Sequence, residues 1–323
     1  MESGELLRNI INLPLISCDL AEEMLAGNYR SIFKGQGMEF DEARHYEPGD
    51  DIRSIDWNAS ARFGYPFVKM YREERELTIL ILLDISPSMH ASKMQTSKTQ
   101  TSKTQESKTQ ASKSNNQSLN PYEQGLIAAS LIAFSAEHTG QQIGALFFDR
   151  DIEKVFPPRK GRKHIMSLVM SAFQYQNNVP PRRSSQGSDI TSALTSAQRL
   201  LKKRSLVVVI SDFYGIGWER EMGYLCRKHD CIAIRISGPD KLQYSGLITL
   251  EDPETGIRIE APAGFNSFQE SWSGWHAERS LHWESECKKS GASYLDLSTE
   301  TDAPSALIKF FGSRTAGKMR KKP

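Results

Sequence analysis

Five oxygen-bearing side chains stand at three places where a buried strand is predicted to end or a helix to begin. They are Asp84, Ser86 and Ser88 in the stretch DISPS, Ser188 in QGSD, and Asp212 in ISDF. Two carboxylates and three hydroxyls form an oxygen-only set, which suits a hard cation such as Mg²⁺ or another hard divalent ion. The two carboxylates would balance the charge of that ion. These residues therefore predict a metal site.

The elements that must position these side chains begin at Leu77. From there, buried β-rich runs such as LTILILLD and SLVVVISDF alternate with helical patterns such as PYEQGLIAASLIAFSAEH. This alternation predicts an α/β fold with a doubly wound, mainly parallel sheet of the Rossmann type. Parallel strands end at the same edge of a sheet, and ligands bind where the strand order reverses. We therefore expect the five side chains to converge at that edge.

A plainer interpretation of the same residues is structural. Asp84 and Asp212 would be helix caps, and Ser86 or Ser88 would be turn residues. A cap accounts well for one loop. It does not account for acidic ends on two separate buried strands, and this difference favours the metal site.

The three loops DISPS, QGSD and ISDF resemble those of a von Willebrand factor A domain with its metal-ion-dependent adhesion site. The ligands that this resemblance implies are Asp84, Ser86, Ser88, Ser188 and Asp212. The second loop of that family usually supplies threonine, whereas this chain has Ser188. Thr191, one turn into the following helix, is a less favoured substitute.

Longer stretches are similar to the bacterial domain-of-unknown-function 58 family. They are GQGMEFDEARHYEPGDDIRSIDWNASAR, YREERELTILILLDISPSM, LEDPETG and the closing SYLDL. The similarity extends over residues 20–312. It implies a von Willebrand factor A-like domain, no established enzymatic reaction, and association with AAA+ ATPases of the MoxR type.

Composition predicts the domain boundaries. Residues 1–75 are expected to form an N-terminal helix and a hairpin/loop-rich region packed on the main domain, which spans 76–312. The repeat insertion 91–118 is expected to be disordered, because its Ser/Thr/Lys/Gln composition cannot bury a core. Residues 245–290 are expected to hold an inserted β-hairpin that turns at DPETG, followed by a helix. Residues 313–323 form a basic segment, expected to be a flexible tail.

Charge and cysteine content limit the class of protein. The 323 residues carry a formal net charge of +2. The repeats and the basic tail contain so many lysines and arginines that the remaining residues together carry a net negative charge. The four cysteines form no CxxC pair, which is typical of a reducing compartment. We therefore expect a cytoplasmic protein without a transmembrane segment.

The leading hypothesis is a metal-dependent protein-interaction module that is not an enzyme. It would bind an acidic group of a partner, and the family resemblance implies a MoxR-type AAA+ ATPase as that partner. One alternative is a phosphotransferase of the haloacid-dehalogenase kind, but that chemistry needs a second aspartate at position 86, which is Ser86. Another alternative is nucleic-acid binding through the basic tail, although no aromatic residues interleave with its basic ones.

Overall fold

The computed structural model describes residues 13–14, 17–24, 38–47, 50–51, 55–73, 77–90, 119–177, 188–238, 248–251 and 256–319. The chain divides into two compact units. The larger unit comprises residues 1–27 and 78–323, and the smaller unit comprises residues 28–77. The repeat insertion 91–118, for which disorder is predicted, lies outside the described residues.

The larger unit contains a six-stranded sheet with the order β10-β7-β6-β3-β4-β5. The strands are β3 (Thr78–Asp84), β4 (Gln142–Phe148), β5 (Ile152–Arg159), β6 (Leu206–Ser211), β7 (Asp230–Ser237) and β10 (Ser293–Ser298). All neighbouring pairs are parallel except β4 and β5. The chain first runs from β3 to β4 and then returns to β6 on the other side of β3. This reversal makes the boundary between β3 and β6 the switch point of the sheet.

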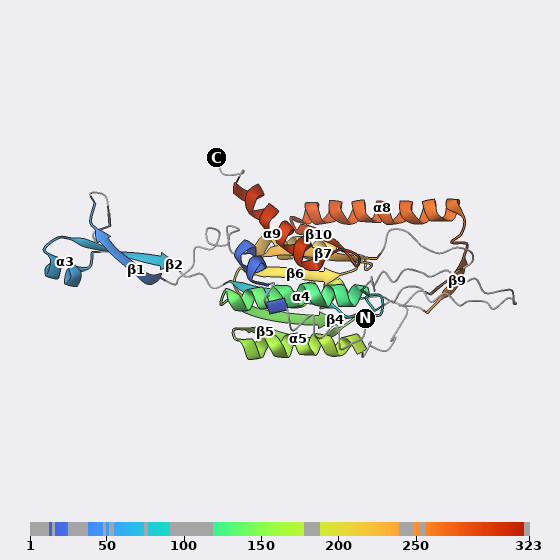
Figure 1. Ribbon diagram of the computed structural model, residues 1–323, viewed down its shortest axis with the longest axis horizontal. Coiled ribbons are helices and arrows are strands. Elements are labelled where there is room, and N and C mark those ends of the chain that lie inside the picture. The colour runs from blue at the N-terminus through green and yellow to red at the C-terminus, as the bar shows by residue number, and fades with distance from the viewer. Residues whose placement is uncertain are drawn as a thin grey trace, which may run out of the picture. The chain divides into compact units, whose positions relative to one another are not determined.

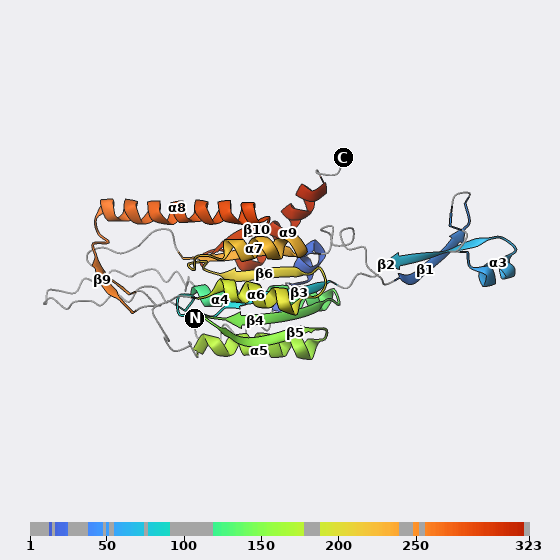
Figure 2. The ribbon, with the colours of Figure 1, turned by 180° about the vertical axis from the view of Figure 1, so that it is seen from behind.

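Helices cover both faces of this sheet, as the alternation of strands and helices predicts. Figure 1 shows α4 (Pro121–His138), α5 (Arg162–Asn177) and α9 (Ala303–Met319) on one face. Figure 2 shows α6 (Ile190–Leu200) and α7 (Glu219–Lys228) on the other, where α8 (Asn266–Ser290) packs on α7. The fold is thus a mixed α/β architecture with a mostly parallel sheet, compatible with a Rossmann-like arrangement.

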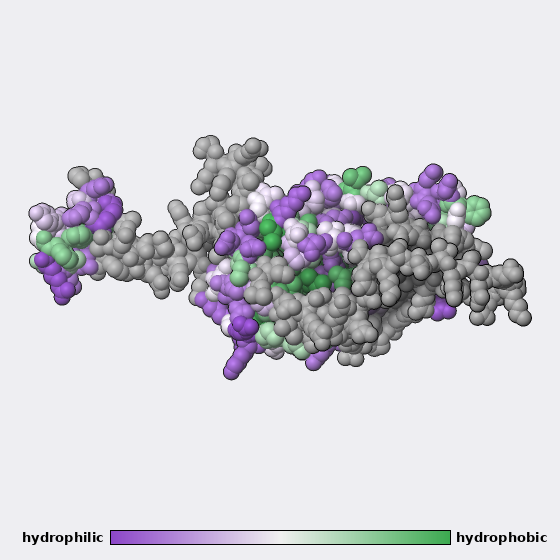
Figure 3. Space-filling model, viewed as in Figure 1, coloured by the Kyte–Doolittle hydropathy of each residue, from purple (hydrophilic) through white to green (hydrophobic). Residues whose placement is uncertain are grey.

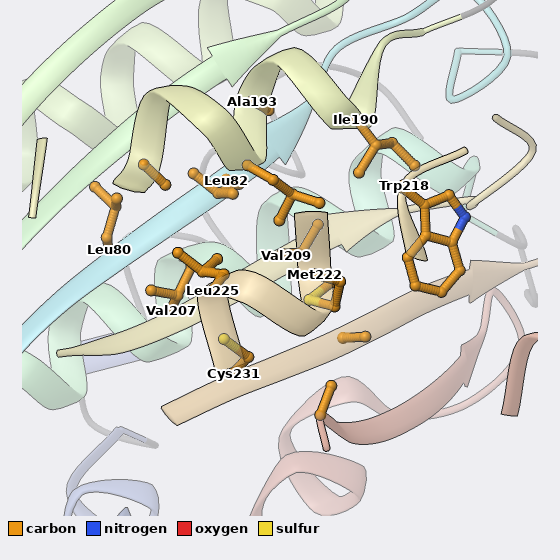
Figure 4. Packing of buried hydrophobic residues seen from close by; sticks show 14 of the residues in the cluster. Leu80, Leu82, Ile190, Ala193, Val207, Val209, Trp218, Met222, Leu225 and Cys231 are labelled. Carbon is orange, nitrogen blue, oxygen red and sulfur yellow. The ribbon is translucent and has the colours of Figure 1, made fainter. Parts of the chain in front are cut away.

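The core consists of aliphatic side chains on both faces of the central strands. In β3, Leu80 to Leu83 are completely buried, as expected for a parallel strand that is covered on both sides. Figure 4 shows Ile190 of α6 and Met222 of α7 packed over Val209 of β6. Each such side chain stabilises the fold by about 1.5–3 kcal/mol. A rigid sheet therefore supports the loops at its carboxyl edge.

The edge strand β5 is an element that the sequence analysis did not predict. It pairs antiparallel with β4 and ends in Pro157, Pro158 and Arg159. Prolines remove ladder donors, so they occur in edge strands rather than central ones. Its side chains alternate between partly buried and exposed. The residue types of IEKVFPPR do not show this alternation, so the sequence carried no period-two signal for the strand.

The inserted segment has the predicted order of a hairpin and a helix. The strands β8 (Ile248–Glu251) and β9 (Arg258–Ala261) pair antiparallel, and α8 follows them. In both ribbon views, the N-terminal half of α8 extends with β9 beyond the edge of the sheet where the parallel strands end (Figures 1 and 2).

Both ends of the larger unit contain helix. Residues 17–24 are helical, with Leu20 and Met24 buried. At the other end, α9 continues to Met319 and so includes part of the segment 313–323 that was expected to be a flexible tail. There Arg314 forms an ion pair of 2.7 Å with Asp230. None of the described helices combines the length and apolar character that a bilayer-spanning segment needs.

The smaller unit contains an antiparallel pair, β1 (Met38–His45) with β2 (Phe67–Glu73), and the short helix α3 (Trp57–Phe63). Asp56 caps α3 by accepting hydrogen bonds from the N–H groups of Asn58 and Ala59. No residue of α3 is buried, and the side chain of Trp57 is 67% exposed. Asp50 pairs with Arg44 at 2.6 Å.

Candidate metal site

The candidate site lies at the switch point of the sheet, where β3 and β6 end side by side. The two strands pair in parallel as far as Leu83 and Ile210. Asp84 is therefore adjacent to Ser211, the last residue of β6, and Asp212 follows directly. Asp84 is completely buried and Asp212 is almost so. The register of two buried strands thus places two carboxylates close together in a region of little solvent.

Asp84 accepts three hydrogen bonds, from its own loop, from the loop before α6 and from the end of β6. Its Oδ2 accepts from the hydroxyl of Ser211 at 2.6 Å and from the hydroxyl of Ser188 at 3.1 Å. Its Oδ1 accepts from the backbone N–H of Ser86 at 2.9 Å. The hydroxyls of Ser86 and Ser88 are hydrogen-bonded to each other at 2.9 Å. The first and second predicted loops therefore meet at Asp84.

Asp212 occupies a turn that is held in an unusual backbone conformation. Its Oδ1 accepts a hydrogen bond from the N–H of Tyr214 at 3.0 Å, and its buried Oδ2 has no hydrogen-bond partner within the described residues. Phe213 between them has φ of 54°, in the left-handed region that non-glycine residues seldom adopt. Packing of its ring against Trp218 and Trp283 holds this conformation. Strain of this kind is often found at functional sites.

The second loop is fixed by the start of α6 and by the end of β4. Asp189 caps α6 by accepting from the N–H of Ser192 at 3.1 Å. The backbone N–H of Asp189 donates to the carbonyl of Asp149, just beyond β4, at 2.9 Å. Gly215 lies close by, since a Cβ there would stand 3.0 Å from the carbonyl oxygen of Ser188. These backbone contacts hold the hydroxyl of Ser188 against Asp84.

Neither Asp84 nor Asp212 is a helix cap. Each accepts a hydrogen bond from the backbone N–H two residues further on, which is the geometry of an Asx turn. The capping role belongs to Asp189 instead. The interpretation of these residues as caps and turn residues therefore explains the local turns. It does not explain why two carboxylates lie at the adjacent ends of β3 and β6.

Burial disfavours the ionised form of both carboxylates, and the charge of Asp212 adds to this effect at Asp84. Burial, and then the charge of Asp212, raise the pKa of Asp84 to about 7, although hydrogen bonds from Ser211 and Ser86 act in the opposite direction. Burial also raises the pKa of Asp212, which the hydroxyl of Ser88 and the charge of Arg279 lower in part. A cation between the two carboxylates would remove this repulsion.

The donor set fits a hard divalent cation that keeps some water. The available oxygen donors are the hydroxyl of Ser188 on Asp84, the bonded hydroxyls of Ser86 and Ser88 in the loop after Asp84, and the unpartnered Oδ2 of Asp212 at the end of the neighbouring strand. Among the described residues, no cluster of three or more His, Cys, Asp or Glu side chains could hold a metal ion. A cation here would therefore need the hydroxyls and water to complete its shell.

Ser211 is a site residue that the sequence analysis did not assign. Its buried hydroxyl donates to Asp84 at 2.6 Å and accepts from the N–H of Phe213 at 3.0 Å. It thus links the end of β3 to the turn that carries Asp212. Its position at the end of a buried apolar run was the available signal, because a hydroxyl there must find a partner.

Comparisons with known proteins identify relatives of unknown function. The family model described as "Protein of unknown function DUF58" matches residues 42–118 and 104–277. An uncharacterized protein of Mycobacterium tuberculosis is 26% identical over 302 residues, which cover 91% of this chain and 85% of that protein. An uncharacterized protein of Mycobacterium avium is 26% identical over 164 residues, covering 50% of this chain and 94% of that protein.

One solved structure with a weaker likeness is proximal thread matrix protein 1 of the mussel byssus. It is 18% identical with a TM-score of 0.33, and the match covers 51% of this chain and 38% of that protein. A TM-score this low does not establish a shared fold.

Proposed function

We propose that this chain, which belongs to the family described as "Protein of unknown function DUF58", is a metal-dependent protein-interaction module with a von Willebrand factor A-like site. Mg²⁺ or a similar hard cation would be held by Asp84, Ser86, Ser88, Ser188 and Asp212. The ion would take a carboxylate of a partner protein as a further ligand. A MoxR-type AAA+ ATPase is the partner class that the family resemblance favours.

The observation that carries this proposal is the pair of buried carboxylates at the switch point. Asp84 accepts hydrogen bonds from the hydroxyls of Ser188 and Ser211, and Oδ2 of Asp212 has no hydrogen-bond partner within the described residues. Burying two carboxylates beside each other is costly unless a cation or protons compensate. A bound cation would offset the free-energy cost of burying these two carboxylates.

Water and partner would share the remaining positions of the cation. Mg²⁺ prefers six oxygen ligands and gives up its water reluctantly. Two protein carboxylates leave the ion electrophilic, so a third carboxylate from outside is an attractive ligand. The N-terminus of α6, which Asp189 caps beside Ser188, adds a positive dipole end that favours an incoming anion.

The alternative phosphotransferase reaction lacks such support. Position 86 is Ser86, which cannot act as the general acid that this chemistry needs. Oδ2 of Asp84 already accepts two hydrogen bonds. Release of phosphate from a phosphomonoester in the presence of Mg²⁺, lost in Asp84→Asn, would favour the enzyme instead.

The first test is Mg²⁺ binding measured by titration calorimetry. We expect the wild-type protein to bind Mg²⁺ and Asp84→Asn to lose this binding at least about tenfold, since a charged ligand is removed. Asp189→Asn is the matched control. It removes a neighbouring exposed carboxylate but keeps a good helix cap. Equal binding by all three proteins would contradict the site.

The second test is capture of the partner. A lysate that contains a MoxR-type ATPase would be passed over immobilised protein with Mg²⁺ or with EDTA. Retention of the ATPase should require both Mg²⁺ and Asp84, while Asp189→Asn behaves as wild type. Retention that is unchanged by EDTA would contradict metal-dependent binding.

A further inference from the structure

An arginine that contacts two aromatic rings lies beside the candidate metal site. The guanidinium carbon of Arg279 on α8 lies 3.9 Å from the ring centroid of Tyr214 and 5.5 Å from that of Trp275. Its Nη2 donates to the carbonyl of Phe213 at 2.9 Å. We call the cluster of Tyr214, Trp275 and Arg279 the rim. Because Phe213 follows Asp212 directly, the rim adjoins the turn that carries Asp212.

The rim holds Arg279 in one orientation without neutralising it. Stacking on two rings and a hydrogen bond to a backbone carbonyl restrict the guanidinium, which is planar and always charged. Within the described residues, no carboxylate forms an ion pair with it, whereas Arg235 nearby pairs with Asp296. An arginine fixed in this way offers its remaining N–H groups to a ligand from outside.

The charges at this place call for an anion. If Asp84 and Asp212 together balance a divalent cation, Arg279 leaves the loaded site with one positive charge in excess. One incoming carboxylate would make the site neutral. Without the cation, the same site carries an excess of negative charge when both aspartates are ionised. The site as a whole, Arg279 included, is therefore positively charged toward an acidic ligand only when the metal is present.

The faces of the rim that point to solvent are apolar. The side chains of Tyr214 and Trp275 are 46% and 47% exposed, and their rings stack on each other with centroids 6.4 Å apart. Figure 3 shows polar and hydrophobic residues mixed over α8, the helix that carries Trp275 and Arg279. Exposed aromatic side chains of this kind are enriched in protein-binding surfaces.

We propose that the rim formed by Tyr214, Trp275 and Arg279 selects a partner segment in which an acidic residue is flanked by an aromatic or aliphatic one. This inference rests on the proposed function. The acidic side chain would bind the metal with help from the charge of Arg279. The apolar side chain beside it would lie against the rings of Tyr214 and Trp275.

The test uses a random peptide library displayed on phage, selected on the immobilised full-length protein with Mg²⁺ or with EDTA. We expect Mg²⁺-dependent enrichment of peptides that hold Asp or Glu next to an aromatic or aliphatic residue. Synthetic copies of one enriched peptide would then be titrated by fluorescence anisotropy. Arg279→Gln should weaken its binding roughly tenfold, as loss of an interfacial charge partner does. Trp275→Ala should abolish the preference for the apolar neighbour while keeping the preference for the acid.

Arg227→Gln is the matched control. Arg227 also lies over a tyrosine ring, that of Tyr224 at 5.5 Å, but it is on the last turn of α7, away from the site. It should bind the peptide as wild type does. If Arg279→Gln and Trp275→Ala select the same peptides with unchanged affinity, the rim inference is wrong and the proposed function stands. If wild type enriches no acidic peptide with Mg²⁺, both are wrong.

Discussion

At the scale of residues, the raised pKa of Asp84 makes a testable statement about stability. An unfolded aspartate has a pKa of about 4, whereas burial and then the charge of Asp212 raise the pKa of Asp84 to about 7. Between these values the folded state keeps a proton that the unfolded state has released. Without metal, stability should therefore fall as pH rises from about 4 to about 7 and then level off. Asp212, whose pKa is also raised, contributes with the same sign.

Urea unfolding in EDTA from about pH 5 to about pH 8 would measure this dependence. Asp84→Asn should flatten the curve and be more stable than wild type at the upper end, because it removes the buried charge. Asp189→Asn should follow the wild-type curve. A wild-type protein that becomes more stable over this range, relative to Asp84→Asn, would contradict the raised pKa.

The same scale shows what the sequence could reveal of the site. Asp84, Ser86 and Ser188 could be assigned because they stand at predicted strand and helix boundaries, and the structure brings them into contact. Ser211 also stands at the end of a predicted strand, but that position does not identify its partner. Its role depends on the register between β3 and β6, and a hydrophobic pattern does not specify which residues of two parallel strands lie side by side.

At the scale of elements, the close approach of the loop after β6 to the loop before α6 should be sensitive to one methyl group. A Cβ on Gly215 would stand 3.0 Å from the carbonyl oxygen of Ser188 and also contact Ile190. Gly215→Ala should therefore displace Ser188 from Asp84 and weaken Mg²⁺ binding about tenfold, as loss of a supporting contact does. Titration calorimetry of Mg²⁺ would measure this loss.

Gly223→Ala is the control for this substitution. Gly223 lies within α7, and a Cβ there would meet nothing within 4 Å. Alanine should leave Mg²⁺ binding unchanged and stabilise the helix by about 0.5–1 kcal/mol. Equal Mg²⁺ affinity of the two variants would mean that the loops can separate without affecting the site.

Elements with strong patterns were predictable, and those with mixed patterns were not. The buried runs of β3 and β6 and the helix α4, which begins with Asn120 as its cap and Pro121 in its first turn, follow local rules closely. The strand β5 was not predicted from the sequence, because its two prolines are typical of a loop. Only its pairing with β4 makes it a strand, and that pairing depends on tertiary structure.

At the scale of the whole molecule, the larger unit contains every element that the site needs. The six-stranded sheet and the five candidate ligands all lie within it, between residues 78 and 298. The sequence predicted one main domain with residues 1–75 packed on it. A division that groups residues 1–27 with the main unit depends on contacts between distant parts of the chain, which composition does not specify.

We therefore predict that the larger unit folds and binds Mg²⁺ without the smaller one. Residues 28–77 would be replaced by a flexible Gly/Ser linker of about 12 residues. Mg²⁺ should raise the melting temperature of this variant as much as that of the full chain, since a ligand that binds only the folded state stabilises it by mass action. Differential scanning calorimetry with Mg²⁺ or EDTA would measure both shifts, and Asp84→Asn in the shortened chain should abolish its shift. A shortened protein that folds cooperatively but gains no stability from Mg²⁺, while the full chain does, would mean that residues 28–77 contribute to the metal site.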